Sequence, residues 1–169
     1  VEQLLQGDTL AFTRLIREVG QGDVARRRIA WQWSERHIRQ TVRRLEPWHA
    51  GFICHYADRV IASQQQQRIV LRQDSGFSGQ LWYWILTHLL VERGTLFNTR
   101  QFVRATLWQM AQHYQLDFHQ LVTSLAQAVE RLQITGRVAP VFLQVLADLQ
   151  HEETREFAPQ MTQPNDDEL

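Results

Sequence analysis

Two short motifs carry side chains of the kind that perform catalysis or bind metals: Cys54-His55 and Glu46-x-x-His49. A Cys–His dyad requires two side chains that face each other, but neighbouring positions on a helix point about 100° apart. We therefore expect Cys54 to be a small core residue. The Glu-x-x-His spacing occurs in di-iron bundles, which need a second copy of the motif on a facing helix. The sequence has no second copy, so we interpret Glu46 and His49 as packing at a helix start.

The other residues that bind ions or phosphates show no functional spacing. The remaining histidines lack the separations of a metal site. Gly76 and Gly79 lack the Lys and the Ser or Thr of a phosphate-binding loop. The sequence thus predicts no catalytic residue, no metal site and no cofactor, and we expect a protein that is not an enzyme.

Arginine supplies every basic side chain except histidine, and its distribution along the chain is uneven. There are 18 Arg, no Lys and 18 acidic residues; 12 Arg and 5 acids lie between Arg14 and Arg72. Guanidinium groups make planar, two-pronged contacts with carboxylates and phosphates, so this segment indicates binding to protein acids or to nucleic acid. Codon bias of the genome is the alternative explanation. The candidate contact residues are Arg26, Arg27, Arg28, Arg36 and Arg43.

Six tryptophans are present, and four of them form two pairs spaced by two residues, Trp31/Trp33 and Trp82/Trp84. Positions spaced by two on a helix diverge by about 200°. One member of each pair is therefore expected at a seam between helices or on the surface. The alternative is a large aromatic core.

A contact surface is predicted around Trp84 and Trp108, with Arg100 and Arg104 beside them. Trp108 lies off the apolar stripe of its predicted helix, and exposed Trp next to Arg is typical of interaction hot spots. We expect this surface to bind another copy of the chain or a different subunit.

Apolar residues recur with helical spacing along nearly the whole chain, which predicts an all-α bundle of seven or eight helices. Residues 68–71 resemble a strand, inside a non-helical linker near residues 68–78. We expect an Arg-rich helical lobe over residues 1–73, a second helical lobe over 74–157 and a flexible acidic tail over 158–169. The segment 81–93 is apolar all round and should be the most buried helix.

Several helix starts can be located from the sequence. Asn98 with Gln101, and Asp117 with Gln120, have the spacing of a capping box and fix the starts of two successive helices. Further starts are predicted at three positions, Asp23 and Ser34 as N-caps and Pro47 as a first helical residue.

The chain shows no signal for a membrane. No apolar run approaches the roughly 20 residues that span a bilayer. A single cysteine favours synthesis in a reducing compartment.

A family resemblance rests on several blocks of sequence in one order. The main block runs from Leu81 to Gly94 (LWYWILTHLLVERG), and Phe97-Asn98 and Phe102-Val103 follow it. These blocks resemble the tape-measure proteins of extracellular contractile injection systems, the phage-tail-like particles of bacteria. The resemblance covers about residues 1 to 132. Its other matching positions are Gly7-Asp8, Arg26–Arg28, the block from Leu45 to Tyr56, Leu107, Ala111 and Tyr114.

The resemblance implies a structural and assembly role. Its expected partners are baseplate or tube proteins, with several copies of the chain in each particle, after synthesis in the bacterial cytoplasm. Family members are much longer, so we expect a domain of a longer protein or a short member. The alternative is an Arg-rich helical regulator that binds nucleic acid, which the zero net charge and the absence of Lys disfavour.

Overall fold

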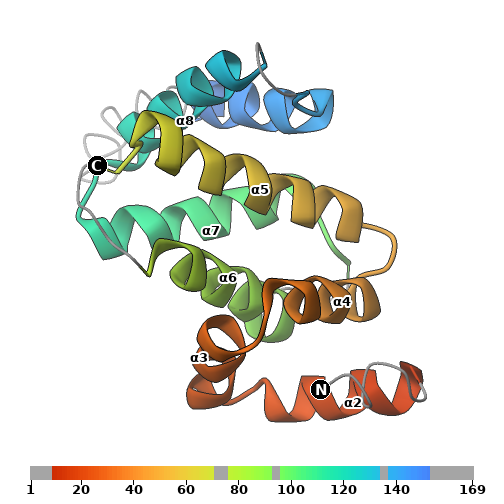
Figure 1. Ribbon diagram of the computed structural model, residues 1–169. Coiled ribbons are helices and arrows are strands. Elements are labelled where there is room, and N and C mark those ends of the chain that lie inside the picture. The colour runs from red at the N-terminus through yellow and green to blue at the C-terminus, as the bar shows by residue number, and fades with distance from the viewer. Residues whose placement is uncertain (1–8, 71–75, 93–95, 134–136, 153–169) are drawn as a thin grey trace, which may run out of the picture.

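The computed structural model describes residues 9–70, 76–92, 96–133 and 137–152. Every regular element in these ranges is a helix (Figure 1), which confirms the predicted all-α bundle. A π-helical turn, η1 (His88–Glu92), continues α6, and a further helical run covers residues 140–152. The predicted tail over 158–169 lies outside the described residues. The α-helices are α2 (Thr9–Val19), α3 (Asp23–Gln32), α4 (Glu35–Leu45), α5 (Ala50–Gln67), α6 (Phe77–Thr87), α7 (Thr99–Tyr114) and α8 (Phe118–Leu132).

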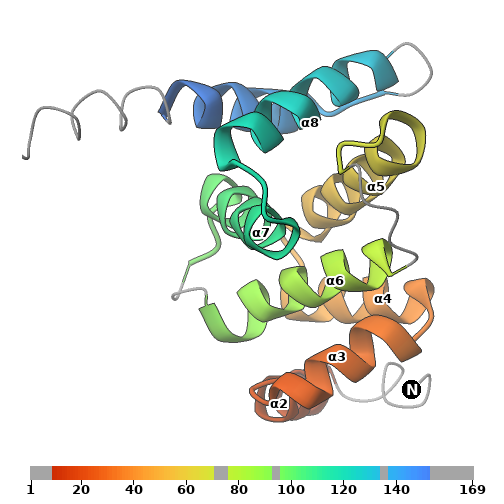
Figure 2. The same ribbon diagram turned by 90° about the vertical axis from the view of Figure 1, so that its left-hand side faces the viewer.

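The helices stack in layers from one end of the molecule to the other (Figures 1 and 2). The run 140–152 and α8 form one end, α5 and α7 lie next to them, α6 and α4 follow, and α3 and α2 form the other end. The packed pairs include α5 with α8, α7 with α8, α6 with α7 and α3 with α6. Helix α6 therefore lies between α3 and α7.

Helix α6 is buried on almost every side, as its all-round apolar character predicts. Its start is at Phe77, inside the predicted non-helical linker near residues 68–78. Leu81, Ile85 and Leu86 have no exposed surface. Because α3 covers one side of this helix and α7 another, apolar residues spaced all around it find partners.

The predicted caps of the two later helices are confirmed. Asn98 Oδ1 accepts a hydrogen bond from the Gln101 backbone N–H at 2.9 Å, and Asp117 Oδ2 accepts one from the Gln120 N–H at 3.0 Å. Ser34 caps α4 in the same way, accepting from the backbone N–H three residues later at 3.3 Å.

Two other predicted helix starts are wrong by one to three residues. Gly22 is the N-cap of α3 and Asp23 is the first helical residue, with its carboxylate bonded to Arg27 and Tyr83 instead of to the helix end. Pro47 lies in a turn before α5, whose N-cap is His49.

The segment after α5 is not a strand in its described part, residues 68–70. Arg68 ends the helix in the left-handed conformation, with φ of 50°. The Gln64 side-chain amide then bonds both backbone groups of Val70, at 2.8 Å to the N–H and 2.9 Å to the carbonyl. A side chain thus occupies the hydrogen-bonding positions that a neighbouring strand would use. Residues 71–75 of the predicted linker lie outside the described residues.

One hydrophobic core cluster includes residues from both predicted lobes. Tyr56 of α5 shares a hydrogen bond of 2.7 Å with Thr106 of α7. Its ring also packs against Phe102 and Phe142, with centroids 5.2 and 5.4 Å away. The core is therefore continuous across the expected boundary between residues 73 and 74.

Candidate interaction surface

Helix α7 carries the predicted contact residues on its outer face. Its inner face is fixed by buried Phe102, Val103 and Leu107, and its start is fixed by the Asn98 cap. Positions three and four residues apart share a face of a helix. The burial of one stripe therefore leaves an outward stripe that includes Arg104 and Trp108, both exposed.

A groove of about 380 Å³ follows this outward stripe. Trp108 is 47% exposed, and its ring rests on Phe118 with centroids 5.6 Å apart. Glu92, at the end of the π-helical turn, supplies a carboxylate to the lining. The groove thus combines an indole, charges of both signs and side-chain amides. Its lining residues are Glu92, Gln101, Arg104, Ala105, Trp108 and Gln109.

The two arginines next to Trp108 are exposed, but they share a carboxylate of the same chain. Arg100 forms an ion pair with Glu152. Arg104 Nη1 lies 3.8 Å from the other oxygen of that carboxylate. This arrangement links α7 to the helical run 140–152 and lowers the net positive charge beside the groove.

Trp84 does not belong to the contact surface, and this part of the prediction is wrong. Its side chain is only 4% exposed. It lies at the seam between α6 and α7, with its ring 5.6 Å from His113 and 6.3 Å from Tyr114. Helix α7 covers the side of α6 that a lone helix would expose, so the second tryptophan of the pair is also buried.

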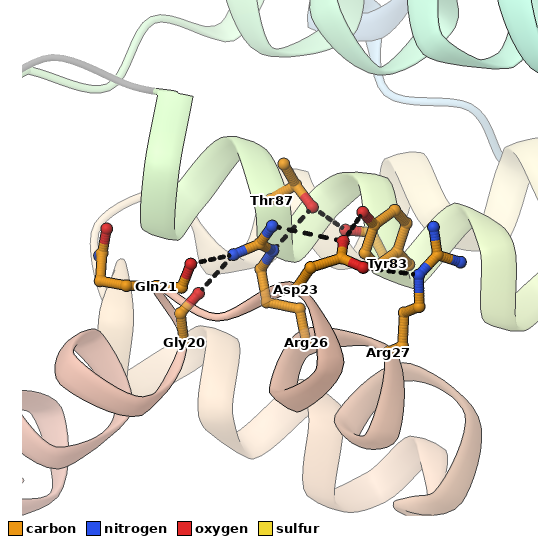
Figure 3. A network of polar contacts seen from close by, with 7 residues as sticks. All are labelled: Gly20, Gln21, Asp23, Arg26, Arg27, Tyr83 and Thr87. Carbon is orange, nitrogen blue, oxygen red and sulfur yellow. Dashed lines mark hydrogen bonds and ion pairs between the residues drawn. The ribbon is translucent and has the colours of Figure 1, made fainter.

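Arg26 is likewise an internal residue and not a contact residue (Figure 3). It is 7% exposed. Its Nη1 donates to the carbonyls of Gly20 and Gln21 at 2.8 Å each, and its Nε donates to Thr87 Oγ1 at 3.1 Å. Carbonyls at the end of a helix lack partners within that helix. Arg26 satisfies those after α2 and ties α3 to α6.

The other predicted arginines, Arg27, Arg28, Arg36 and Arg43, are exposed. Arg27 Nε is 3.0 Å from Asp23 Oδ2, and its guanidinium lies 4.3 Å from the centroid of the Tyr83 ring.

Arg39, on the neighbouring helix α4, also pairs with carboxylates of the same chain. It forms ion pairs with Asp58 and Glu35 and lies over Trp82. Carboxylates and backbone carbonyls of the same chain therefore bind several arginines of the Arg-rich segment, which the regulator hypothesis assigns to nucleic acid.

The Glu46-x-x-His49 and Cys54-His55 motifs make contacts within the bundle and form no catalytic or metal-binding arrangement among the described residues. Glu46 Oε1 and His49 Nδ1 are 3.0 Å apart at the start of α5. Burial raises the pKa of the Cys54 thiol, which keeps it protonated near neutral pH. His55 Nε2 accepts a hydrogen bond from the Ala139 backbone N–H at 3.0 Å. Within the described ranges, no group of three His, Cys, Asp or Glu residues is arranged to hold a metal ion.

Comparison with known proteins gives no match to any family model, curated protein or solved structure. Among the described helices, none has both the length and the apolar character needed to cross a membrane.

Sequence reasoning identified Trp108 and Arg104 but missed Glu92. A π-helical turn leaves no spacing signal that distinguishes it from an α-helical one, so the position of the Glu92 side chain could not be derived. On α3, the sequence analysis predicted Arg27 and Arg28 as contact residues and one tryptophan of the Trp31/Trp33 pair at a seam or on the surface, but it did not join them with Val24 into one face. Its signal, the spacing of Val24, Arg28 and Trp31 along one side of a helix, was present in the sequence.

Proposed function

We propose that this chain is a structural and assembly module that binds other proteins through the Trp108 groove on α7. The observation that carries the proposal is a half-exposed indole, supported from below by Phe118, beside a groove lined with side chains of mixed charge. Tryptophan and arginine are enriched at the residues that dominate protein-binding energy. A pre-formed groove also reduces the ordering cost of binding.

We further propose that the module belongs to a tape-measure protein of a contractile injection system and contacts baseplate or tube proteins. The sequence blocks that resemble this family support the assignment, and they form part of the packed centre of the bundle. Leu81 to Glu92 form most of α6 and η1, and Asn98 caps the helix that bears the groove. In this role the chain is synthesised in the bacterial cytoplasm, incorporated in the particle in several copies, and not an enzyme.

The nucleic-acid regulator is the weaker candidate. Arg26 is buried on backbone carbonyls, and Arg39 is paired with two carboxylates. Zero net charge removes the overall attraction on which most nucleic-acid binding depends.

The test of the proposed function uses the bacterium that encodes the chain. Particles are pelleted from a strain with an epitope-tagged chain and from a strain in which its coding region is deleted. We expect the tagged chain in the particle fraction by mass spectrometry, and lost or abnormal particles in the deletion strain by electron microscopy. A chain that stays out of the particle fraction, together with normal particles after deletion, would contradict the assignment.

A further inference from the structure

The outer face of α3 forms a second surface, distinct from the Trp108 groove. A shallow concavity of about 330 Å³ is lined by Val24, Arg27, Arg28, Trp31 and Gln32. Val24 is 64% exposed and Trp31 is 44% exposed. Val24, Arg28 and Trp31 follow the i, i+4, i+7 spacing of one helix face. Two apolar side chains therefore lie at the ends of this surface with guanidinium groups between them.

The indole of Trp31 is supported by the helix beneath it. Gly79 of α6 leaves space for the ring, since a Cβ atom at that position would lie 2.7 Å from Trp31 Nε1. The Tyr83 ring, one turn further along α6, is 6.2 Å from the indole by ring centroids. Trp31 thus packs against α6 and remains partly exposed on its outer side.

The charge of this face is positive and only partly balanced. Asp23 accepts hydrogen bonds from both Tyr83 and Arg27, so its carboxylate is already engaged (Figure 3). The Arg27 guanidinium is still half-exposed beyond this contact. Arg28 is exposed, and among the described residues no carboxylate pairs with it.

We propose that the Val24–Trp31 face of α3 docks an acidic segment of a partner protein. This segment carries an aliphatic or aromatic side chain that packs between Val24 and Trp31, flanked by carboxylates that pair with Arg28 and Arg27. The arginine fork matches a carboxylate in two-pronged geometry. Because Trp31 is held by α6 before binding, little side-chain entropy is lost on docking.

A protein partner fits this surface better than a nucleic acid does. The face offers two guanidinium groups, and an acid of the same chain already engages one of them. Nucleic-acid binding gains its affinity from the neutralisation of many phosphates along a backbone. One indole, together with one arginine that pairs with no carboxylate in the described part of the chain, matches a short peptide motif with one anchor.

The test is a selection of displayed random 12-residue peptides on the immobilised full chain. We expect the enriched peptides to carry an aromatic or aliphatic residue flanked by Asp or Glu. Anisotropy titration with one labelled enriched peptide should then show at least tenfold weaker binding to the Trp31→Ala and Arg28→Glu variants. Arg28→Glu alters only an exposed side chain, so its result does not depend on the packing of Trp31. The matched controls are Trp48→Ala, at a 90% exposed tryptophan elsewhere, and Arg137→Glu.

The proposal is overturned by several distinct results. These are no enrichment, enrichment of neutral or basic peptides, or binding that survives both variants. Labelled single-stranded DNA that binds the parent and not Arg28→Glu would assign the face to nucleic acid instead. Self-association in sedimentation velocity that Trp31→Ala abolishes would assign it to a second copy. This surface is separate from the Trp108 groove, so failure here leaves the function proposed for that groove untouched.

Discussion

The Trp108 face of α7 and the Val24–Trp31 face of α3 share a pairing of tryptophan with arginine but have different surroundings. Each carries a half-exposed tryptophan with an arginine one turn earlier on the same side of the helix. On α7, neighbouring segments add a groove wall with Glu92, and Glu152 lies next to Arg104. On α3, Arg28 has no such acid within the described part of the chain. Two similar stripes therefore present different charges at the surface, because the helices around them supply different side chains.

The largest expected effect is a difference in the free energy of unfolding between a variant in the Trp108 face and a variant in the core beneath it. Trp84→Ala should lower the free energy of unfolding by about 3–5 kcal/mol, because it empties a packed seam between α6 and α7. Trp108→Ala removes a half-exposed ring and should cost less than about 1.5 kcal/mol. Urea unfolding of both variants against the parent measures the difference. Equal losses would mean that Trp108 is as much a core residue as Trp84.

The next largest effect concerns the support of the Val24–Trp31 face. Arg26→Ala should cost about 3 kcal/mol, because it leaves two carbonyls after α2 without their charged donor. Arg28→Ala, two residues further along the same helix, should change stability by less than about 0.5 kcal/mol. The midpoints of urea unfolding report both values. A mild effect of Arg26→Ala would show that Arg26 does not hold α3 on α6.

The starts of the helices could be predicted from the sequence more reliably than the surfaces. Asn98 and Asp117 act on backbone groups two or three residues away, so local spacing contains all the information. The exposure of Trp84 and Arg26 depends on helices far away in the sequence. Trp84 was assigned to the surface because the spacing of apolar residues within α6 does not show that α7 packs against that side of the helix. Arg26 was grouped with its neighbours by residue type, although its partners lie at the end of α2 and on Thr87 of α6.

A smaller effect on stability is expected from the helix caps, including the Asn98 cap at the start of the helix that carries the Trp108 face. Asn98→Ala and Asp117→Ala should each cost about 1 kcal/mol, since each leaves a backbone N–H without its side-chain acceptor. Ser124→Ala, at an exposed position inside α8, is the control and should leave stability nearly unchanged. Thermal and urea unfolding measure all three. An unchanged midpoint in both cap variants would contradict the role of these side chains.

The smallest effect is the pH response of the Val24–Trp31 face. Hydrogen bonds from Tyr83 and then Arg27 lower the pKa of Asp23 below its ordinary value of 3.8. The folded protein therefore gains stability from ionised Asp23 above that value and loses it as the pH falls through the lowered pKa. NMR titration of the Asp23 carboxyl carbon should give a midpoint below 3.8, and Tyr83→Phe should raise it. A parent midpoint at or above 3.8, or no rise in the variant, would contradict these contacts.

The most direct test of the proposed function places a photo-crosslinking amino acid at position 108 in the organism that encodes the chain. Benzoylphenylalanine replaces one aromatic side chain with another at a half-exposed site, and the same replacement of exposed Val141 serves as the control. After illumination, mass spectrometry should identify a tube or baseplate protein joined to position 108 and not to position 141. Crosslinks at position 108 to nucleic acid, or equal crosslinking to such proteins from both positions, would contradict the proposal that the Trp108 groove is a docking site for the particle.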